Sequence, residues 1–194
     1  MTVRLLITLL STVLFVIIFA VSPSMAQDVR MPYRFDVFGS LGGAKYDGTK
    51  IHELNFGGGF VVRPFSRKLS PLRGLGFEFE ANRTSTDPGA FEPPRKTATG
   101  AVLYGYPLKH FEPYVLIGMG ASTLGCYGLN LGCDQGIRVG VGGLGVRVFL
   151  NERVSLRPEF RIFEAMGSNA YIYGASGFGK DLYRASIGIG YQFH

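Results

Sequence analysis

The sequence predicts an all-β chain whose strands form an eight-stranded antiparallel up-and-down barrel, and three observations carry this prediction. The composition is rich in glycine and aromatic residues and poor in charge, with 28 Gly, 16 Phe and 10 Tyr in 194 residues and 18% charged residues. Apolar and polar residues alternate with a period of two, which is the period of a strand. Longer polar or glycine-rich connections alternate with mostly shorter ones, which is typical of an up-and-down barrel.

The first 26 residues are predicted to be an export signal ahead of one domain. One positive charge precedes a largely apolar run over residues 5–21, and Ser24 and Ala26 supply the small residues that a signal peptidase requires. We expect cleavage before Gln27, which leaves residues 27–194 as the barrel domain. An uncleaved membrane anchor is the alternative, because the apolar run is slightly long for a signal and slightly short for a spanning helix.

The expected strands follow from the alternation. In residues 183–193 the odd positions are Tyr, Ala, Ile, Ile, Tyr and Phe, and the even positions are polar or glycine. Residues 75–82 and 154–162 alternate nearly as regularly. Weaker alternation places the remaining strands at residues 34–41, 52–62, 97–106, 114–123 and 137–150.

Two positions are expected to interrupt regular pairing. The apolar phase of residues 137–150 switches near Gly142 and Gly143, which predicts a bulge at that point. Pro158 cannot donate a hydrogen bond to a neighbouring strand, so we expect a bulge there or a later start of its strand.

Alternation alone leaves open which face points inward, because a soluble barrel buries its apolar face and a membrane barrel turns that face to lipid. Aromatic residues gather toward the strand ends, as in an interfacial girdle, and the polar faces carry a balanced set of charges, as a narrow filled lumen requires. We therefore predict a transmembrane β-barrel with a charge ladder in its lumen, formed by Asp36, Glu53, Glu78, Glu80, Arg157, Glu159, Arg161 and Arg184. Its bases are completed by Arg34 and by one of Arg138 and Arg147.

The chain ends Gly-Ile-Gly-Tyr191-Gln-Phe193-His194, an aromatic-tipped strand. With the export signal and the eight-strand rhythm, residues 27–194 resemble the small bacterial outer-membrane β-barrel family, of the OmpA/OmpX-like or OmpW-like kind. The resemblance implies an outer-membrane location, contact with outer-membrane lipid and lipopolysaccharide, and an assembly signal at Tyr191 and Phe193 that the barrel-assembly machinery reads during biogenesis. In that family the aromatic residue is usually last, whereas here His194 follows it.

Both cysteines lie close together in the sequence, at Cys126 and Cys133. In an oxidising compartment such a pair is expected to close a small loop by a disulfide. A zinc site is a poor alternative because no histidine lies near the pair.

The sequence predicts no catalytic, cofactor-binding or metal-binding residues, and no nucleic-acid partner. The glycines from Gly140 to Gly145 match a dinucleotide-binding spacing, but a predicted strand follows them where a helix is needed. His52 and Glu53 are neighbours and therefore point to opposite faces of a strand, while His110 is expected at the other rim. Nucleic acid is excluded because the chain has no basic run or basic helix.

The leading functional hypothesis is therefore a non-catalytic, structural or surface-exposed barrel whose loops bind an extracellular partner. Residues 124–136 and 164–181 are the candidate contact loops, the second with Tyr171, Tyr173 and Phe178. One alternative is a narrow OmpW-like conduit for small apolar molecules, and another is a soluble exported lipid-binding barrel. The conduit would use space left on the inner face by Gly57, Gly59, Gly118, Gly120, Gly188 and Gly190.

Overall fold

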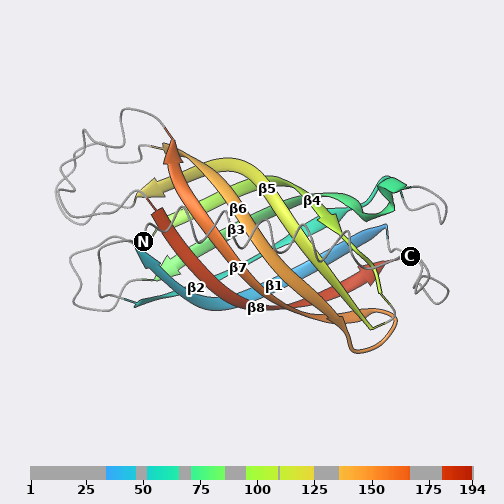
Figure 1. Ribbon diagram of the computed structural model, residues 1–194. Coiled ribbons are helices and arrows are strands. Elements are labelled where there is room, and N and C mark those ends of the chain that lie inside the picture. The colour runs from blue at the N-terminus through green and yellow to red at the C-terminus, as the bar shows by residue number, and fades with distance from the viewer. Residues whose placement is uncertain are drawn as a thin grey trace, which may run out of the picture.

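The computed structural model describes residues 34–46, 52–65, 71–85, 95–108, 110–124, 136–166 and 181–193. Within them lie one 3-10 helix, η2 (Pro71–Gly74), and eight strands: β1 (Phe35–Tyr46), β2 (His52–Val62), β3 (Leu75–Ser85), β4 (Arg95–Gly105), β5 (Phe111–Leu124), β6 (Gly136–Phe149), β7 (Val154–Met166) and β8 (Asp181–Phe193). Each strand pairs antiparallel with the next, and β8 pairs with β1, so the sheet closes into a barrel (Figure 1). The predicted fold class is confirmed.

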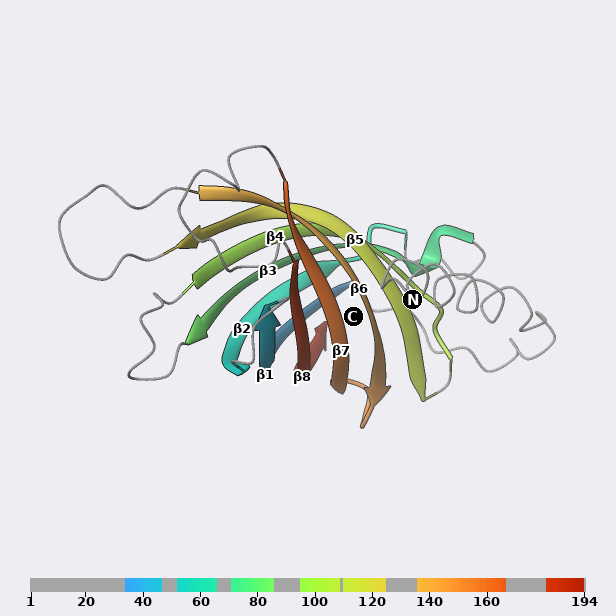
Figure 2. The same cartoon turned by 60° about the vertical axis from the view of Figure 1, so that its left-hand side comes forward.

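The two ends of the barrel differ in how the strands connect. Residues 63–74, 106–110 and 150–153 join strands at one end, where β1 also begins and β8 ends; we call this the short-turn end. At the opposite end β1, β3, β5 and β7 end and β2, β4, β6 and β8 begin; we call this the loop end. Figure 2 shows the strands curving obliquely between the two ends.

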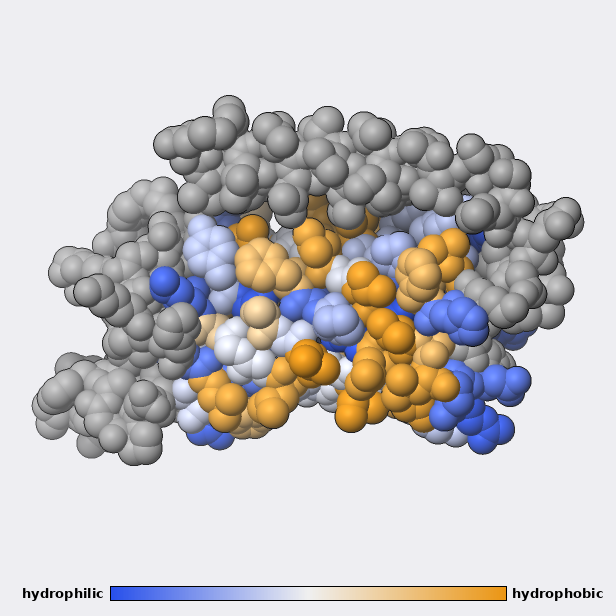
Figure 3. Space-filling view, turned by 60° about the horizontal axis from the view of Figure 1, so that its bottom comes forward, coloured by the Kyte–Doolittle hydropathy of each residue, from blue (hydrophilic) through white to orange (hydrophobic). Residues whose placement is uncertain are grey.

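Apolar side chains cover the outside of the barrel and charged ones fill the inside. In β3, Phe77 and Phe79 are 42% and 50% exposed, whereas the alternate residues Glu78 and Glu80 are 1% and 3% exposed. On the face that Figure 3 shows, hydrophobic residues gather mainly over the middle of the barrel and hydrophilic ones toward its ends. This arrangement is stable where lipid, rather than water, surrounds the barrel. Among the described residues, no helix has the length and apolar character needed to cross a bilayer.

The inside is not uniformly polar. An apolar core lies on the inner faces of β4 to β7 and consists of Ala101, Leu103, Tyr114, Leu116, Val141 and Phe163. This core explains the switch of apolar phase in β6, because Val139 and Val141 are buried inside while Val148 is 39% exposed outside.

The bulge predicted near Gly142 and Gly143 is therefore wrong. β6 keeps a single register with β7, from the pair Arg138 and Met166 to the pair Val148 and Leu156. The alternation of inward and outward residues continues through both glycines, and only the chemical character of the inner face changes.

The irregularity expected at Pro158 takes another form than a bulge. β7 begins at Val154, before the proline, and its register with both neighbours is unchanged. Pro158 still pairs with Ile187 of β8, but the pairs of Arg157 and Pro158 with β6 are missing. The proline thus interrupts the pairing of β7 with β6 over two residues, and no side chain moves to the other face of the sheet.

Packing against an inner glycine gives a test of this fold. A side chain at Gly145 would collide with the Tyr114 hydroxyl group and lie 2.9 Å from the Pro158 carbonyl oxygen. We expect Gly145→Val to lower the free energy of unfolding by about 1–3 kcal/mol, because the inner wall becomes overpacked. Urea unfolding in lipid vesicles would measure the change.

The matched control is Gly142→Ala on the same strand, where a Cβ meets nothing within 4 Å. This variant should be as stable as the parent or slightly more stable. Equal destabilisation by both substitutions would contradict the inner packing described for β6.

Candidate functional site: the ion clusters of the barrel interior

The largest polar cluster lies in the middle of the lumen and joins three strands. Its members, which we call the central ion cluster, are Glu78 and Glu80 of β3, Arg157, Glu159 and Arg161 of β7, and Arg184 of β8. They share a position on the inward face of their strands and are each at most 8% exposed. Three carboxylates thus face three guanidinium groups, and the cluster has no net charge.

Contacts within the central ion cluster are dense. Glu159 accepts hydrogen bonds from Arg157 Nη2 at 2.7 Å, Arg161 Nε at 2.5 Å and Arg184 Nη2 at 3.1 Å. Glu80 Oε2 lies 2.8 Å from Arg161 Nη1 and 2.9 Å from Arg184 Nη2. Glu78 forms ion pairs with both Arg157 and Arg161. Each acid therefore contacts at least two arginines, which is how several ions can share a site that excludes water.

Two aromatic side chains complete the surroundings of Arg157. The Tyr114 hydroxyl group donates a 2.7 Å hydrogen bond to Glu159 and accepts one of 2.7 Å from Arg157 Nε. On the other side, the Arg157 guanidinium carbon lies 4.1 Å from the centroid of the Phe38 ring. A cation–π contact with β1 and a hydrogen bond with β5 thus hold the side chain of Arg157, which extends from β7.

A second set of ions lies toward the short-turn end. This short-turn ion cluster consists of Asp36 of β1, Arg63 after β2, Glu112 of β5 and Arg147 of β6. Arg147 lies 2.7 Å from Glu112 and 3.5 Å from Asp36, and Arg63 also forms an ion pair with Glu112. Two acids face two arginines, so this cluster is also neutral.

The structure places seven of the eight residues of the predicted charge ladder in these two clusters. Six of its members form the central ion cluster, and Asp36 belongs to the short-turn ion cluster. Glu53 is 4% exposed and pairs in register with Ala44, which also pairs with Arg184. Of the further bases, Arg147 is inside, whereas Arg138 and Arg34 are exposed.

Two inner ions were missing from the prediction, Arg63 and Glu112. Arg63 follows Val61 at the spacing of the inner face, but the sequence places it in a basic connection. Glu112 precedes a proline and lies outside the expected strand at residues 114–123, although it lies two residues before the inward Tyr114. Extending the period-two alternation past the assumed strand ends identifies both.

The candidate catalytic and metal-binding residue types are dispersed in the described part of the chain. They contain no group of three His, Cys, Asp or Glu side chains that could hold a metal ion. Position 52 begins β2 at the loop end and His110 precedes β5 at the short-turn end, so the two histidines belong to opposite rims. The acids of both clusters are held by arginines.

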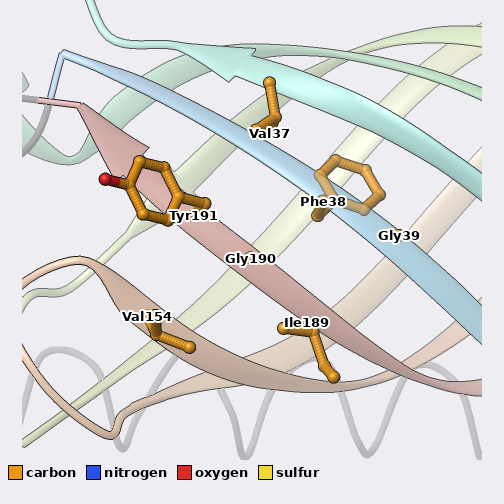
Figure 4. A pocket seen from close by; sticks show the side chains of 7 residues that line it. All are labelled: Val37, Phe38, Gly39, Val154, Ile189, Gly190 and Tyr191. Atoms are coloured by element: carbon orange, nitrogen blue, oxygen red, sulfur yellow. The ribbon is translucent and has the colours of Figure 1, made fainter.

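A surface depression lies between β1, β7 and β8, near the short-turn end (Figure 4). Val37, Ile189 and Val154 line it, with Phe38, Gly39, Gly190 and Tyr191 around them. Apart from the Tyr191 hydroxyl group, its lining offers no acid, base or nucleophile. This depression is apolar surface at the level of the lipid.

The predicted assembly residues close the barrel at the short-turn end. Tyr191 and Phe193 are exposed on the outward face of β8, with ring centroids 4.9 Å apart. Phe35 of β1 lies 5.6 Å from Phe193 and 5.8 Å from Phe60 of β2. Several predicted features lie outside the described residues: the export signal (residues 1–26), His194, and residues 125–135 and 167–180 of the contact loops, with Cys126, Cys133, Tyr171, Tyr173 and Phe178.

The barrel is similar to several solved outer-membrane barrels. Neisserial surface protein A matches with a TM-score of 0.59 and 12% identity, over 82% of this chain and 96% of that chain. The N-terminal β-barrel domain of OprF from Pseudomonas aeruginosa matches with a TM-score of 0.57 and 12% identity, over 81% and 97%. The outer membrane protein OprG from Pseudomonas aeruginosa matches with a TM-score of 0.51 and 18% identity, over 86% and 99%. At these identities the likeness establishes the fold alone.

Comparison with curated protein sequences finds no match to this chain. The model of one protein family, described as the outer membrane protein beta-barrel domain, matches residues 11–193. The inverted barrel, with ions inside and apolar residues outside, has the architecture that such a domain requires. The chain therefore belongs to the outer membrane protein beta-barrel family, and its location is the bacterial outer membrane.

Proposed function

We propose that this protein is a non-catalytic and non-conducting barrel that stands in the outer membrane and presents its loops to an extracellular partner. The observation that carries the proposal is the path of the central ion cluster. Arg157 and Arg161 of β7 reach Glu78 of β3, which is the strand opposite β7 in an eight-stranded barrel. An eight-stranded barrel is just wide enough for side chains to fill. Salt bridges that cross the lumen therefore close it.

The second ion cluster supports the same proposal. Asp36 and Arg147 link β1 with β6, and Arg63 and Glu112 link the end of β2 with β5. These contacts again join strands that are not neighbours in the sheet. A solute passing along the barrel axis would have to separate both sets of buried ions.

The inner glycines do not supply the space that a conduit needs. A Cβ on Gly118 would overlap the backbone of Gly100 and Ala101 in the neighbouring strand, and one on Gly120 would overlap the Ala98 carbonyl group. These glycines allow adjacent strands to approach closely, which is a structural role. The geometry therefore favours the filled barrel over the OmpW-like conduit.

The orientation of the barrel gives the loops their proposed role. Short turns face the periplasm and longer loops face the outside in barrels of this type. The loop end would then carry residues 124–136 and 164–181 to the cell surface, where we place the extracellular partner. Outer-membrane lipid and lipopolysaccharide are the proposed lateral partners, and the barrel-assembly machinery is the proposed partner of Tyr191 and Phe193 during biogenesis.

Conductance tests the closed lumen directly. We expect the purified barrel to produce no discrete current steps in a planar bilayer, because the ion clusters fill its cross-section. The same preparation should migrate differently on a gel before and after boiling, which shows that folded barrels were present. Reproducible steps from such a sample would overturn the non-conducting assignment in favour of the conduit.

The central ion cluster should dominate stability. Glu159→Ala leaves Arg157, Arg161 and Arg184 each with one ionic partner fewer. We expect it to lower the free energy of unfolding by about 3–5 kcal/mol, the usual cost of breaking a buried ion pair. Urea unfolding in vesicles would measure this loss.

Glu164→Ala is the control on the same strand, because Glu164 is exposed on the outward face. It should change stability by less than about 0.5 kcal/mol. If Glu159→Ala does not fold, Arg157→Lys keeps the charge and tests the same contacts at a smaller cost. Stability equal to the parent in both inner variants would refute the role of the cluster.

Intact mass of protein from the outer membrane tests the export signal and the disulfide together. We expect a chain that begins at Gln27 and resists alkylation until it is reduced, because Cys126 and Cys133 are then bonded. A mass that includes residues 1–26 would establish the uncleaved anchor. Alkylation without reduction would show free cysteines.

A further inference from the structure

Two bases of like charge lie side by side on the outward face near the loop end. Arg83 of β3 and Lys96 of β4 are direct partners in the register of the two strands, and both are exposed. Like charges at directly opposed positions of a sheet destabilise it. Their placement on the lipid-facing side therefore calls for an anion that neutralises both.

The described part of the chain does not provide that anion. Neither Arg83 nor Lys96 forms an ion pair with a described acidic side chain. A third outward base, Arg138 of β6, pairs in register with Ala121 of β5, and it too forms no ion pair among the described residues. The exposed acid Glu164 of β7 pairs in register with Gly140 of β6, so it is not the direct partner of Arg138, which pairs with Met166. Positive charge thus exceeds negative charge on this part of the surface.

A groove of about 520 Å³ lies beside the two bases. Its floor is made of small side chains, because Ala81, Ala98 and Ala121 are consecutive partners on β3, β4 and β5. Arg83 and Lys96 line the groove as well. An apolar channel bounded by cations fits a molecule that has both a hydrocarbon chain and an anionic group.

The depth of the site agrees with such an amphiphile. From Leu75 at the short-turn end to Arg83, the strand rises roughly 26 Å along its length, or about 20 Å along the membrane normal at the usual tilt. The apolar band of an outer-membrane barrel is about 25 Å tall. Arg83 and Lys96 thus lie near its outer boundary, where long basic side chains extend to lipid headgroups.

We propose that Arg83 and Lys96 bind the phosphate group of a phosphorylated acyl lipid in the outer leaflet, of the lipopolysaccharide type, with an acyl chain lying over Ala81, Ala98 and Ala121. The site deepens the lipid contact proposed above and rests on the membrane location of the barrel. It does not depend on whether the lumen conducts. Arg138 extends the same positive surface toward β6.

Native mass spectrometry of the folded full chain in a non-ionic detergent tests the site, with diphosphorylated lipid A as the probe. We expect Arg83→Gln/Lys96→Gln to weaken binding about tenfold or more, since hydrogen bonds to charged groups are the strong ones. Ala98→Phe keeps both charges but fills the groove, and it should weaken lipid A binding severalfold.

The control is Lys45→Gln/Arg34→Gln, which removes the same charge at exposed positions outside the groove. It should change binding less than twofold, and a loss equal to that of the first double variant would overturn the site. Lipid A without phosphates should bind weakly, and equally to the parent and to Arg83→Gln/Lys96→Gln. Tight binding of this dephosphorylated lipid would contradict the role of phosphate. Displacement of lipid A by millimolar inorganic phosphate would identify a free-anion site instead of a lipid site.

Folding is checked in every sample by the change of gel mobility on boiling. If the double variant does not fold, Arg83→Gln and Lys96→Gln are tested singly, and each should weaken binding by a part of the full effect. Unchanged binding in both single variants would overturn the proposal. Loss of binding in folded barrels bears on the lipid site, whereas failure of the filled-lumen proposal shows only as conductance.

Discussion

The constraint on which this structure depends is that charged side chains at the level of the lipid tails must point into the lumen. The outward face of each strand lies against lipid over most of its length, so charged residues of the strands are turned into a narrow lumen that has little room for water. An ion in such a place persists only with partners, which is why the inner ions form neutral sets. Arg161, for example, contacts Glu78, Glu80 and Glu159 at once. The salt bridges that result cross the barrel. The same contacts therefore neutralise the charges and fill the lumen.

Part of the interior is apolar, on strands that also carry some of the ions. Leu103, Leu116 and Phe163 pack together on the inner faces of β4, β5 and β7, as they would in a soluble core. Tyr114 connects the apolar and the ionic parts, since its ring belongs to the apolar core and its hydroxyl group bonds Glu159 and Arg157. The interior is therefore a packed core with an ionic part, and its rigidity comes from both.

The period-two pattern was enough to predict the barrel and to place all six residues of the central ion cluster on inward faces, because β3, β7 and β8 alternate regularly. It failed where the chemical character of a face changes along a strand. Val139 and Val141 are apolar and inside, while Arg147 of the same face is charged, and this change resembles a bulge in the sequence. It failed again at Arg63 and Glu112, which lie at strand ends where the alternation was assumed to stop. The pairing of each arginine with its acids depends on the distance across the lumen between strands that are not neighbours in the sheet. The sequence alone does not show that distance.

The two outer boundaries of this barrel are chemically different. The outward strand faces at the short-turn end carry the ring contacts of Phe35, Tyr191 and Phe193. At the loop end the corresponding positions carry Arg83 and Lys96. Aromatic rings suit an interface of either charge, because they need only a boundary between apolar and polar surroundings. Paired cations suit only an anionic surface, since elsewhere their repulsion is uncompensated. The proposed lipid site would therefore orient the loop end toward an anionic leaflet, independently of the loops.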